Sequence, residues 1–255
     1  RLYTQKYDKN FIEIQDFGNE TVFKTLKKKG KNKLSYFNRI IKLLIQIQSI
    51  KHRKVKNFRN QNYIIPKYDK KILINEANLF CDWYAKNNLS KLRKKRFCKK
   101  FKKIIKELTL KLKLKDNIFV HRDFHVSNLM SVKNQIGLID SQDALIGNKA
   151  YDLASLIDDV RLKTSYSFKE KIFKFYIKKQ KNLDIKKFKN DFEILSVLRN
   201  LKIIGIFTRL ALRDRKKNYL RFIPYTWQLI NMRIDQNRTF IDLKNLLSQN
   251  FKKIK

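Results

Sequence analysis

The chain has 255 residues, of which 43% are hydrophobic and 13% aromatic, so it can bury one large core or two small ones. This composition excludes a disordered chain, because disordered chains contain few aromatic and β-branched residues. The net charge of +39 leaves two interpretations: a protein that binds nucleic acid or a membrane surface, or a surface on which lysine replaces other solvated residues.

The basic residues carry no accompanying recognition motif. The sequence lacks an aromatic–basic ribonucleoprotein motif, zinc-finger spacing and a glycine-rich RNA-binding loop, so we predict a solvated basic surface rather than a nucleic-acid partner. Cys81 and Cys98 have neither disulfide nor zinc spacing, which favours a reduced, cytoplasmic protein. No run of 18 apolar residues exists, so no membrane-spanning helix is expected.

The first predicted element is a short strand at residues 11–15 (FIEIQ), which alternate apolar and polar side chains and end in a turn at 16–19. Residues 34–50 have apolar side chains at helical spacing, with Ser35 as the expected N-cap. The polar stretch 57–68, which contains a proline, predicts a loop.

Two amphipathic helices are predicted next, and the second has a strongly basic outer face. Three short strands follow, the last two joined by residues 133–135, and then a helix from residue 150 to near 159 and about four further helices. This order predicts an α+β fold, mostly helical, with a small strand-loop-strand platform. The two helices are expected at 72–89 and 94–114, and the three strands at 117–121, 129–132 and 136–139.

Three polar residues around the predicted hairpin fit phosphoryl transfer. That chemistry needs a base that orients the attacking hydroxyl, and oxygen ligands that hold Mg²⁺ on the nucleotide phosphates. Asp123 is the candidate base, while Asn128, five residues later, and Asp140, directly after a strand, are the candidate metal ligands. A carboxylate at the end of a buried strand is fixed in direction, as a metal ligand should be.

The same residues resemble a known family. Residues 121–129 (HRDFHVSNL) are similar to the catalytic loop of aminoglycoside phosphotransferases and choline-kinase-like enzymes, residues 139–144 (IDSQDA) to their second metal motif, and residues 151–156 (YDLASL) to the helix that follows. The resemblance implies the C-terminal lobe of a protein-kinase-like fold, with ATP and Mg²⁺ as cofactors and a small-molecule substrate. Ser141 replaces the phenylalanine of protein kinases, so their mobile Phe switch is not expected.

A narrower resemblance links residues 68–69, 76–84 and 201–220 to bacterial kinases that phosphorylate N-acetylmuramate and N-acetylglucosamine at the anomeric hydroxyl. It implies an amino-sugar acceptor and a role in cell-wall recycling. Glu76, Asp82 and Trp83 lie on a predicted helix, where they either line a sugar pocket or pack in the core.

The front of the chain departs from the family pattern. Residues 1–18 contain neither a glycine-rich loop nor a strand for a phosphate-binding lysine, and the chain starts at Arg1, so we expect it to begin inside a longer one. We therefore divide it into the end of an N-lobe with its hinge, residues 1–19, and a helical C-lobe, residues 20–255. The resemblance of 13–18 to the hinge implies that Glu13, Gln15 and Phe17 contact adenine.

The Asp-Phe-Gly triplet at residues 16–18 spells the magnesium motif of protein kinases, yet it precedes the catalytic loop, whereas the metal aspartate must follow it. We predict a turn there.

Several polar neighbours have a structural alternative. His121 is expected to brace the loop, Asp152 either to cap its helix or to brace the loop, and Arg122 to lie in solvent. His125 either packs under the loop or approaches the substrate, and Asp143 either receives a sugar hydroxyl or has no role in the reaction. We list both as candidate substrate-binding residues.

Three functions remain open at this point. The first is an ATP-dependent amino-sugar kinase; the second is a kinase of another alcohol, such as choline, homoserine or an aminoglycoside. The third is a basic non-catalytic pseudokinase that binds nucleic acid.

Overall fold

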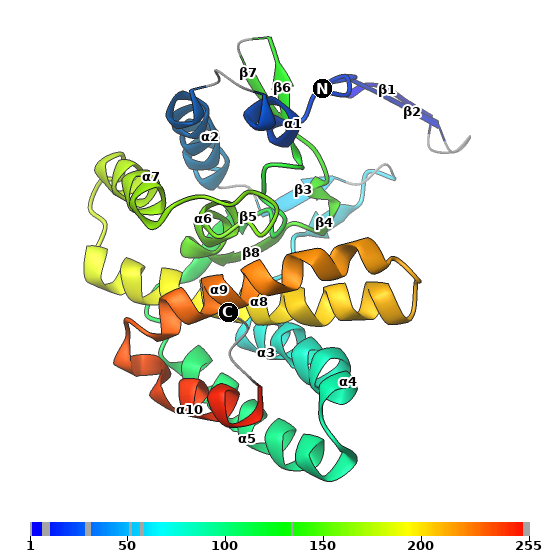
Figure 1. The fold of residues 1–255 in the computed structure, drawn as a ribbon. Helices are drawn as coiled ribbons and strands as arrows, with labels where there is room; N and C mark the ends of the chain where they lie inside the picture. Colours follow the sequence, from blue (N-terminus) through cyan, green and yellow to red (C-terminus); the bar gives the residue numbers. More distant parts are fainter. Residues whose placement is uncertain are drawn as a thin grey trace.

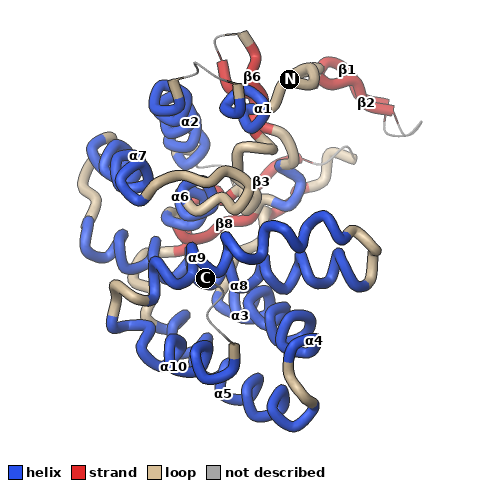
Figure 2. The backbone as a smooth tube through the Cα atoms, viewed as in Figure 1, coloured by secondary structure: helices blue, strands red, loops and turns tan. Residues whose placement is uncertain are grey.

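The computed structural model describes residues 2–6, 11–28, 32–50, 53–56, 59–133 and 135–251. Helices dominate these residues, and the strands are short and form separate two-stranded sheets (Figure 2). This arrangement confirms the predicted α+β class. Within the described residues, no helix combines the length and the apolar character that crossing a bilayer requires.

The chain starts with an antiparallel hairpin, β1 (Leu2–Lys6) and β2 (Phe11–Ile14), which reaches away from the body of the molecule (Figure 1). The strand predicted at residues 11–15 is confirmed, but its partner β1 was not predicted. The turn predicted next is also present, because the backbone N–H of Gly18 donates to Asp16 Oδ1 at 2.7 Å and Gly18 has φ of 70°.

Two helices follow, α1 (Val22–Lys27), which was not predicted, and α2 (Lys33–Gln48). The expected cap at Ser35 is wrong. Asn32 caps α2, because its Oδ1 accepts the backbone N–H of Ser35 at 3.1 Å, which places Ser35 inside the first turn.

Part of the predicted loop at residues 57–68 is wrong as well. Residues 62–64 form β4 (Asn62–Ile64), which pairs antiparallel with β3 (Lys54–Lys56); residues 57–58 lie outside the described residues. All six paired residues are exposed, so the hairpin lacks the alternation of buried and exposed side chains that predicts a strand.

The two predicted amphipathic helices are present with different bounds. The first is α3 (Lys70–Leu79), which continues as a π-helical segment (Phe80–Ala85) and the short α4 (Lys86–Asn88). The second is α5 (Lys91–Leu110), so it begins and ends a few residues earlier than the pattern indicated.

The strand platform consists of two antiparallel pairs of strands. β5 (Asp116–Val120) pairs with β8 (Leu145–Asn148), and β6 (Leu129–Val132) pairs with β7 (Gln135–Leu138). The three predicted strands are confirmed, whereas β8 was missed. Asn134, in the predicted turn between β6 and β7, lies outside the described residues.

The five later helices agree with the predicted helix from residue 150 and the four expected after it. Figure 1 shows α8 and α9 side by side across the middle of the molecule, with α2, α6 and α7 on one side and α3, α5 and α10 on the other. Their bounds are α6 (Ala150–Ile157), α7 (Tyr166–Lys178), α8 (Ile185–Leu212), α9 (Ile223–Ile234) and α10 (Ile241–Asn250).

Two apolar cores lie on either side of α8. One is rich in aromatic residues such as Phe80, Phe101 and Trp227, and it joins α3, α5, α9 and α10. The other includes Phe124 of the catalytic loop and Tyr151 of α6. Because α8 contributes to both cores, it is apolar around most of its circumference.

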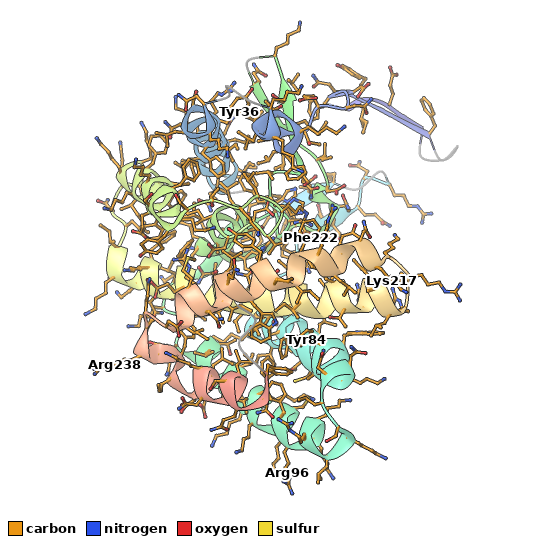
Figure 3. The ribbon with its side chains drawn as sticks, in the orientation of Figure 1. Tyr36, Tyr84, Arg96, Lys217, Phe222 and Arg238 are labelled. Carbon is orange, nitrogen blue, oxygen red and sulfur yellow. The ribbon has the colours of Figure 1, made fainter. Side chains whose placement is uncertain are left out.

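Exposed basic residues lie on separate parts of the fold. Arg96, Lys217 and Arg238 are exposed and extend from α5, from the segment between α8 and α9, and from the segment before α10 (Figure 3). This distribution matches the predicted solvated surface, while the absence of a nucleic-acid partner stays a prediction.

Candidate active site

The catalytic loop, residues 121–128, connects β5 to β6, and its backbone is held by the side chain of Asp152 of α6. The backbone N–H groups of His121 and Arg122 donate to the two carboxylate oxygens of Asp152 at 2.7 and 3.0 Å. His121 Nε2 lies 2.9 Å from the carbonyl oxygen of Ile139, which ties the loop to the end of β7. The bracing roles expected for His121 and Asp152 are confirmed.

Asp152 is completely buried, and its environment is unusual for a carboxylate. Burial raises the pKa of Asp152 to about 7, although the two backbone N–H groups act in the opposite direction. Asp152 therefore serves as a hydrogen-bond acceptor for the loop backbone without an ion-pair partner among the described residues.

Arg122 is not solvated, so that expectation is wrong. Its guanidinium forms an ion pair with Glu76 of α3 at 2.5 Å and donates to the carbonyl oxygen of Asp143 at 3.1 Å. Glu76 also accepts a hydrogen bond from Tyr68 and pairs with Lys202 of α8 at 2.9 Å. The loop motif alone could not predict the ion pair of Arg122, because the partner Glu76 lies on a helix 46 residues earlier in the chain.

The far end of the loop is anchored by a second carboxylate. The backbone N–H of Val126 donates to Asp159 Oδ2 at 3.1 Å, and Asp159 pairs with Arg161 at 3.4 Å. His125, next to Val126, is buried, and burial lowers its pKa to about 4, helped by the charge of Arg161. His125 is therefore neutral near pH 7.

Asp123, Asn128 and Asp140 line one cavity of about 540 Å³. Asn128 Nδ2 donates to the carbonyl oxygen of Asp123 at 3.2 Å, and the backbone N–H of Ile139 donates to the carbonyl oxygen of Asn128 at 3.1 Å. These bonds hold the loop against the end of β7, where Asp140 adopts a left-handed conformation with φ of 63°. The three residues singled out for chemistry thus share one cavity.

The opposite wall of this cavity was not predicted. It comes mainly from α8, which presents two cations and a row of apolar side chains, with single residues from α6 and from the segments after α6 and after α8. The residues of this wall are Tyr151, Arg161, Arg199, Lys202, Ile203, Ile206, Phe207, Leu210 and Tyr219, whereas Ser127 and His125, a candidate substrate-binding residue, line the cavity from the loop.

The cations of α8 affect the candidate base. Burial acts to raise the pKa of Asp123, but the charges of Lys202 and Arg199 outweigh it, so the pKa lies below the usual range. Asp123 is therefore ionised near pH 7. One sequence signal could have marked this wall, because Arg199 and Lys202 interrupt a stretch of α8 that is otherwise almost entirely apolar.

Four other predicted residues lie apart from the lining. Asp143 is exposed in a short 3₁₀ turn (Ser141–Asp143), and only its backbone oxygen is engaged by the loop, through Arg122. Glu13 and Gln15 belong to β2 and the turn after it. The ring of Phe17 packs so closely over Gly137 of β7 that a Cβ there would lie 2.9 Å from it.

The donors at the cavity match magnesium better than a metal held by protein alone. Among the described residues there is no group of three or more His, Cys, Asp or Glu side chains placed to hold a metal ion. Asn128 and Asp140 offer one amide and one carboxylate oxygen. Mg²⁺ usually binds proteins through one or two such ligands and takes the others from phosphate and water.

Comparison with known proteins identifies the family. The model of the phosphotransferase enzyme family APH matches residues 30–182, which is more than half of the chain. The chain belongs to the APH phosphotransferase family. The family resemblance predicted from the catalytic loop is therefore confirmed for this APH chain.

Two curated relatives of this APH chain are both named N-acetylmuramate/N-acetylglucosamine kinase. The relative from Neisseria meningitidis serogroup B is 28% identical over 223 residues, which cover 85% of this chain and 65% of the relative. The relative from Pseudomonas aeruginosa is 27% identical over 254 residues, which cover 97% of this chain and 72% of the relative. The APH chain thus spans about two thirds of the length of these relatives.

Solved structures show the same fold. An ethanolamine kinase from Plasmodium vivax superposes with a TM-score of 0.58 at 14% identity, covering 91% of this chain and 66% of that one. A choline kinase from Cryptosporidium parvum superposes with a TM-score of 0.54 at 16% identity, covering 96% of this chain and 74% of that one. The predicted kinase-like, mostly helical lobe is confirmed for the APH chain.

Proposed function

We propose that this protein transfers the γ-phosphoryl group of ATP to a hydroxyl of an amino sugar such as N-acetylmuramate or N-acetylglucosamine. The observation that carries the proposal is the shared cavity of Asp123, Asn128 and Asp140. The names of the two curated relatives support the choice of sugar. We also propose that the reaction takes place in the cytoplasm, where ATP is available.

Asp123 would act on the acceptor. Its carboxylate is ionised at neutral pH and can accept the proton of the sugar hydroxyl as that oxygen forms its bond to the γ-phosphorus. The bond between this phosphorus and the oxygen of ADP breaks in the same transfer. The cavity cations Lys202 and Arg199 keep Asp123 ionised and so keep the base available.

Asn128 and Asp140 would hold Mg²⁺, which neutralises charge on the nucleotide phosphates when bound. The hydrogen bond from Asn128 Nδ2 to Asp123 leaves the amide oxygen as its metal-binding atom. For the adenine end we propose Glu13, Gln15 and Phe17. For the acceptor we retain His125 and Asp143.

The proposal can be tested with the full-length protein that contains this sequence, supplied with ATP, Mg²⁺ and a panel of N-acetylmuramate, N-acetylglucosamine, choline, homoserine and an aminoglycoside. We expect turnover with at least one of the two sugars. Replacing the base with Asp123→Asn should lower kcat by about 10²- to 10⁴-fold, because a positioned general base contributes a factor of that size.

Asp235→Asn is the matched control, because Asp235 is exposed after α9 and pairs with Lys244 on the surface. Full turnover in Asp123→Asn contradicts the role of the base. Turnover of choline or homoserine with neither sugar contradicts the acceptor, and salt-sensitive RNA binding without any ATP turnover contradicts the kinase assignment.

A further inference from the structure

Arg199 differs from the other two cations of the cavity in its partners. Lys202 pairs with Glu76 at 2.9 Å, and Arg161 pairs with Asp159 at 3.4 Å. Arg199 is only 4% exposed, and among the described residues its Nη1 has no hydrogen-bond partner and its guanidinium no ion pair. One of the three cations is thus buried beside the cavity without an ion pair of its own, although its charge acts on the carboxylate of Asp123.

Such a cation is costly to leave alone. A guanidinium does not lose its proton in a protein, so burial cannot neutralise it. Removing an unpaired charge from water is unfavourable unless an anion and hydrogen bonds replace the water. An anionic ligand in the cavity would supply the hydrogen-bond acceptor that Nη1 of Arg199 lacks.

The surroundings of Arg199 restrict what that anion belongs to. Ile203, Ile206, Phe207 and Leu210 follow it along α8 at helical spacing and line the same cavity, so an apolar surface adjoins the guanidinium. A polyphosphate has no apolar group that could contact such a surface, and the candidate metal ligands for phosphate belong to other elements, the loop and the segment after β7. A ligand with a carboxylate, methyl groups and a sugar ring matches both parts of this wall.

Arg199 also lies close enough to Asp123 for its charge to lower the pKa of that base. The anionic group and the reacting hydroxyl therefore fit on one acceptor molecule of sugar size. N-acetylmuramate has this chemistry, because it is N-acetylglucosamine with a lactyl ether that adds a methyl group and a carboxylate.

We propose that Arg199 binds the carboxylate of an acidic amino-sugar acceptor and gives this enzyme its preference for that acceptor over the neutral amino sugar. The inference rests on the proposed function. Arginine suits the task because its fork of N–H donors binds a carboxylate through two hydrogen bonds.

The test measures kcat/KM of the full-length protein for N-acetylmuramate and for N-acetylglucosamine, in the wild type and in Arg199→Gln. The readout is the ratio of the two values, because the ratio cancels any loss of folded enzyme. We expect Arg199→Gln to lower the ratio by about 10- to 100-fold, the size expected for a charged hydrogen bond to the acceptor. Arg199→Lys should give an intermediate ratio, because it keeps the charge and loses the fork.

Arg213→Gln serves as the control, since Arg213 is exposed at the end of α8 and pairs with Asp214. An unchanged ratio in Arg199→Gln overturns the inference. Equal losses on both sugars with a raised KM for ATP also overturn it and assign Arg199 to the nucleotide phosphates. A wild type that phosphorylates neither sugar overturns the proposed function itself, so the two failures are distinguishable.

Discussion

The two walls of the cavity are held in place by different kinds of interaction. The loop wall is positioned through its backbone, whose N–H groups donate to the buried carboxylates of Asp152 and Asp159. The α8 wall is positioned by the packing of a long helix between two cores, and only its side chains face the cavity. Glu76 connects the walls, because it binds both Arg122 of the loop and Lys202 of α8.

The loop wall carries the residues that we propose for the chemistry, and the α8 wall carries the residue that we propose for acceptor selectivity. A side chain on the α8 wall can change without moving the backbone that carries it, whereas the backbone of the loop wall depends on two buried carboxylates as acceptors. A family built on this plan can vary its acceptor while it keeps the base and metal ligands in one geometry.

The largest effect is expected from breaking the loop wall with Asp152→Ala. The substitution leaves the buried N–H groups of His121 and Arg122 without acceptors, which costs about 2 kcal/mol each, or about 4 kcal/mol of unfolding free energy. Urea unfolding measures the loss. Asp242→Ala is the control, because this aspartate is exposed at the start of α10. A loss below about 1 kcal/mol in Asp152→Ala contradicts a loop wall that depends on this carboxylate.

The connection between the walls is broken by Glu76→Gln, with a smaller expected effect. Arg122 and Lys202 then lose their shared counter-charge in a mostly buried setting, and we expect a loss of about 3 kcal/mol in unfolding free energy. Glu107→Gln on the exposed face of α5 is the matched control. If both variants unfold at the same urea concentration, Glu76 does not join the walls.

The smallest predicted effect is a pH dependence of the unfolding free energy, with opposite signs for the aspartates at the two ends of α6. Burial raises the pKa of Asp152 to about 7, so the folded state holds this proton more tightly than the unfolded state does. Its contribution is fully present below about pH 4 and is lost as the pH rises through about 7. Between pH 5 and 8 the wild type should lose on the order of 2 kcal/mol relative to Asp152→Asn.

Asp158, six residues later, should respond in the opposite sense. Burial acts to raise its pKa, but its pairs with Arg233 at 3.0 Å and Lys169 at 3.2 Å outweigh this, so the pKa is lowered. Its contribution is present above the unfolded pKa, about 3.9, and is lost as the pH falls through the folded value. Parallel stability curves for wild type and Asp152→Asn from pH 5 to 8 contradict the assignment for Asp152.

The loop wall could be predicted from the sequence because its functional residues are close together in the chain. The five-residue spacing from Asp123 to Asn128 and the hairpin before Asp140 leave few other arrangements. The short strand β8 escaped prediction because it pairs with β5 from beyond the whole catalytic segment.

The α8 wall could not be predicted for a different physical reason. A helix that is apolar on all sides has no periodicity that distinguishes a core face from a cavity face. Arg199 and Lys202 are visible as cations in an apolar stretch, but only the fold places them opposite Asp123. The ion pair of Arg122 could not be predicted either, because its partner Glu76 lies on α3, far from the loop in the sequence.

The close approach at Gly205 has a mechanical consequence. A Cβ there would lie 2.3 Å from the carbonyl carbon of Leu79, so the backbones of α8 and α3 touch directly where α3 passes into the π-helical segment. Helices in backbone contact have no layer of side chains between them that can rearrange, so their relative position is fixed by the backbones themselves. A residue larger than glycine at position 205 would therefore push α8 away from α3, and with it Lys202 away from Glu76.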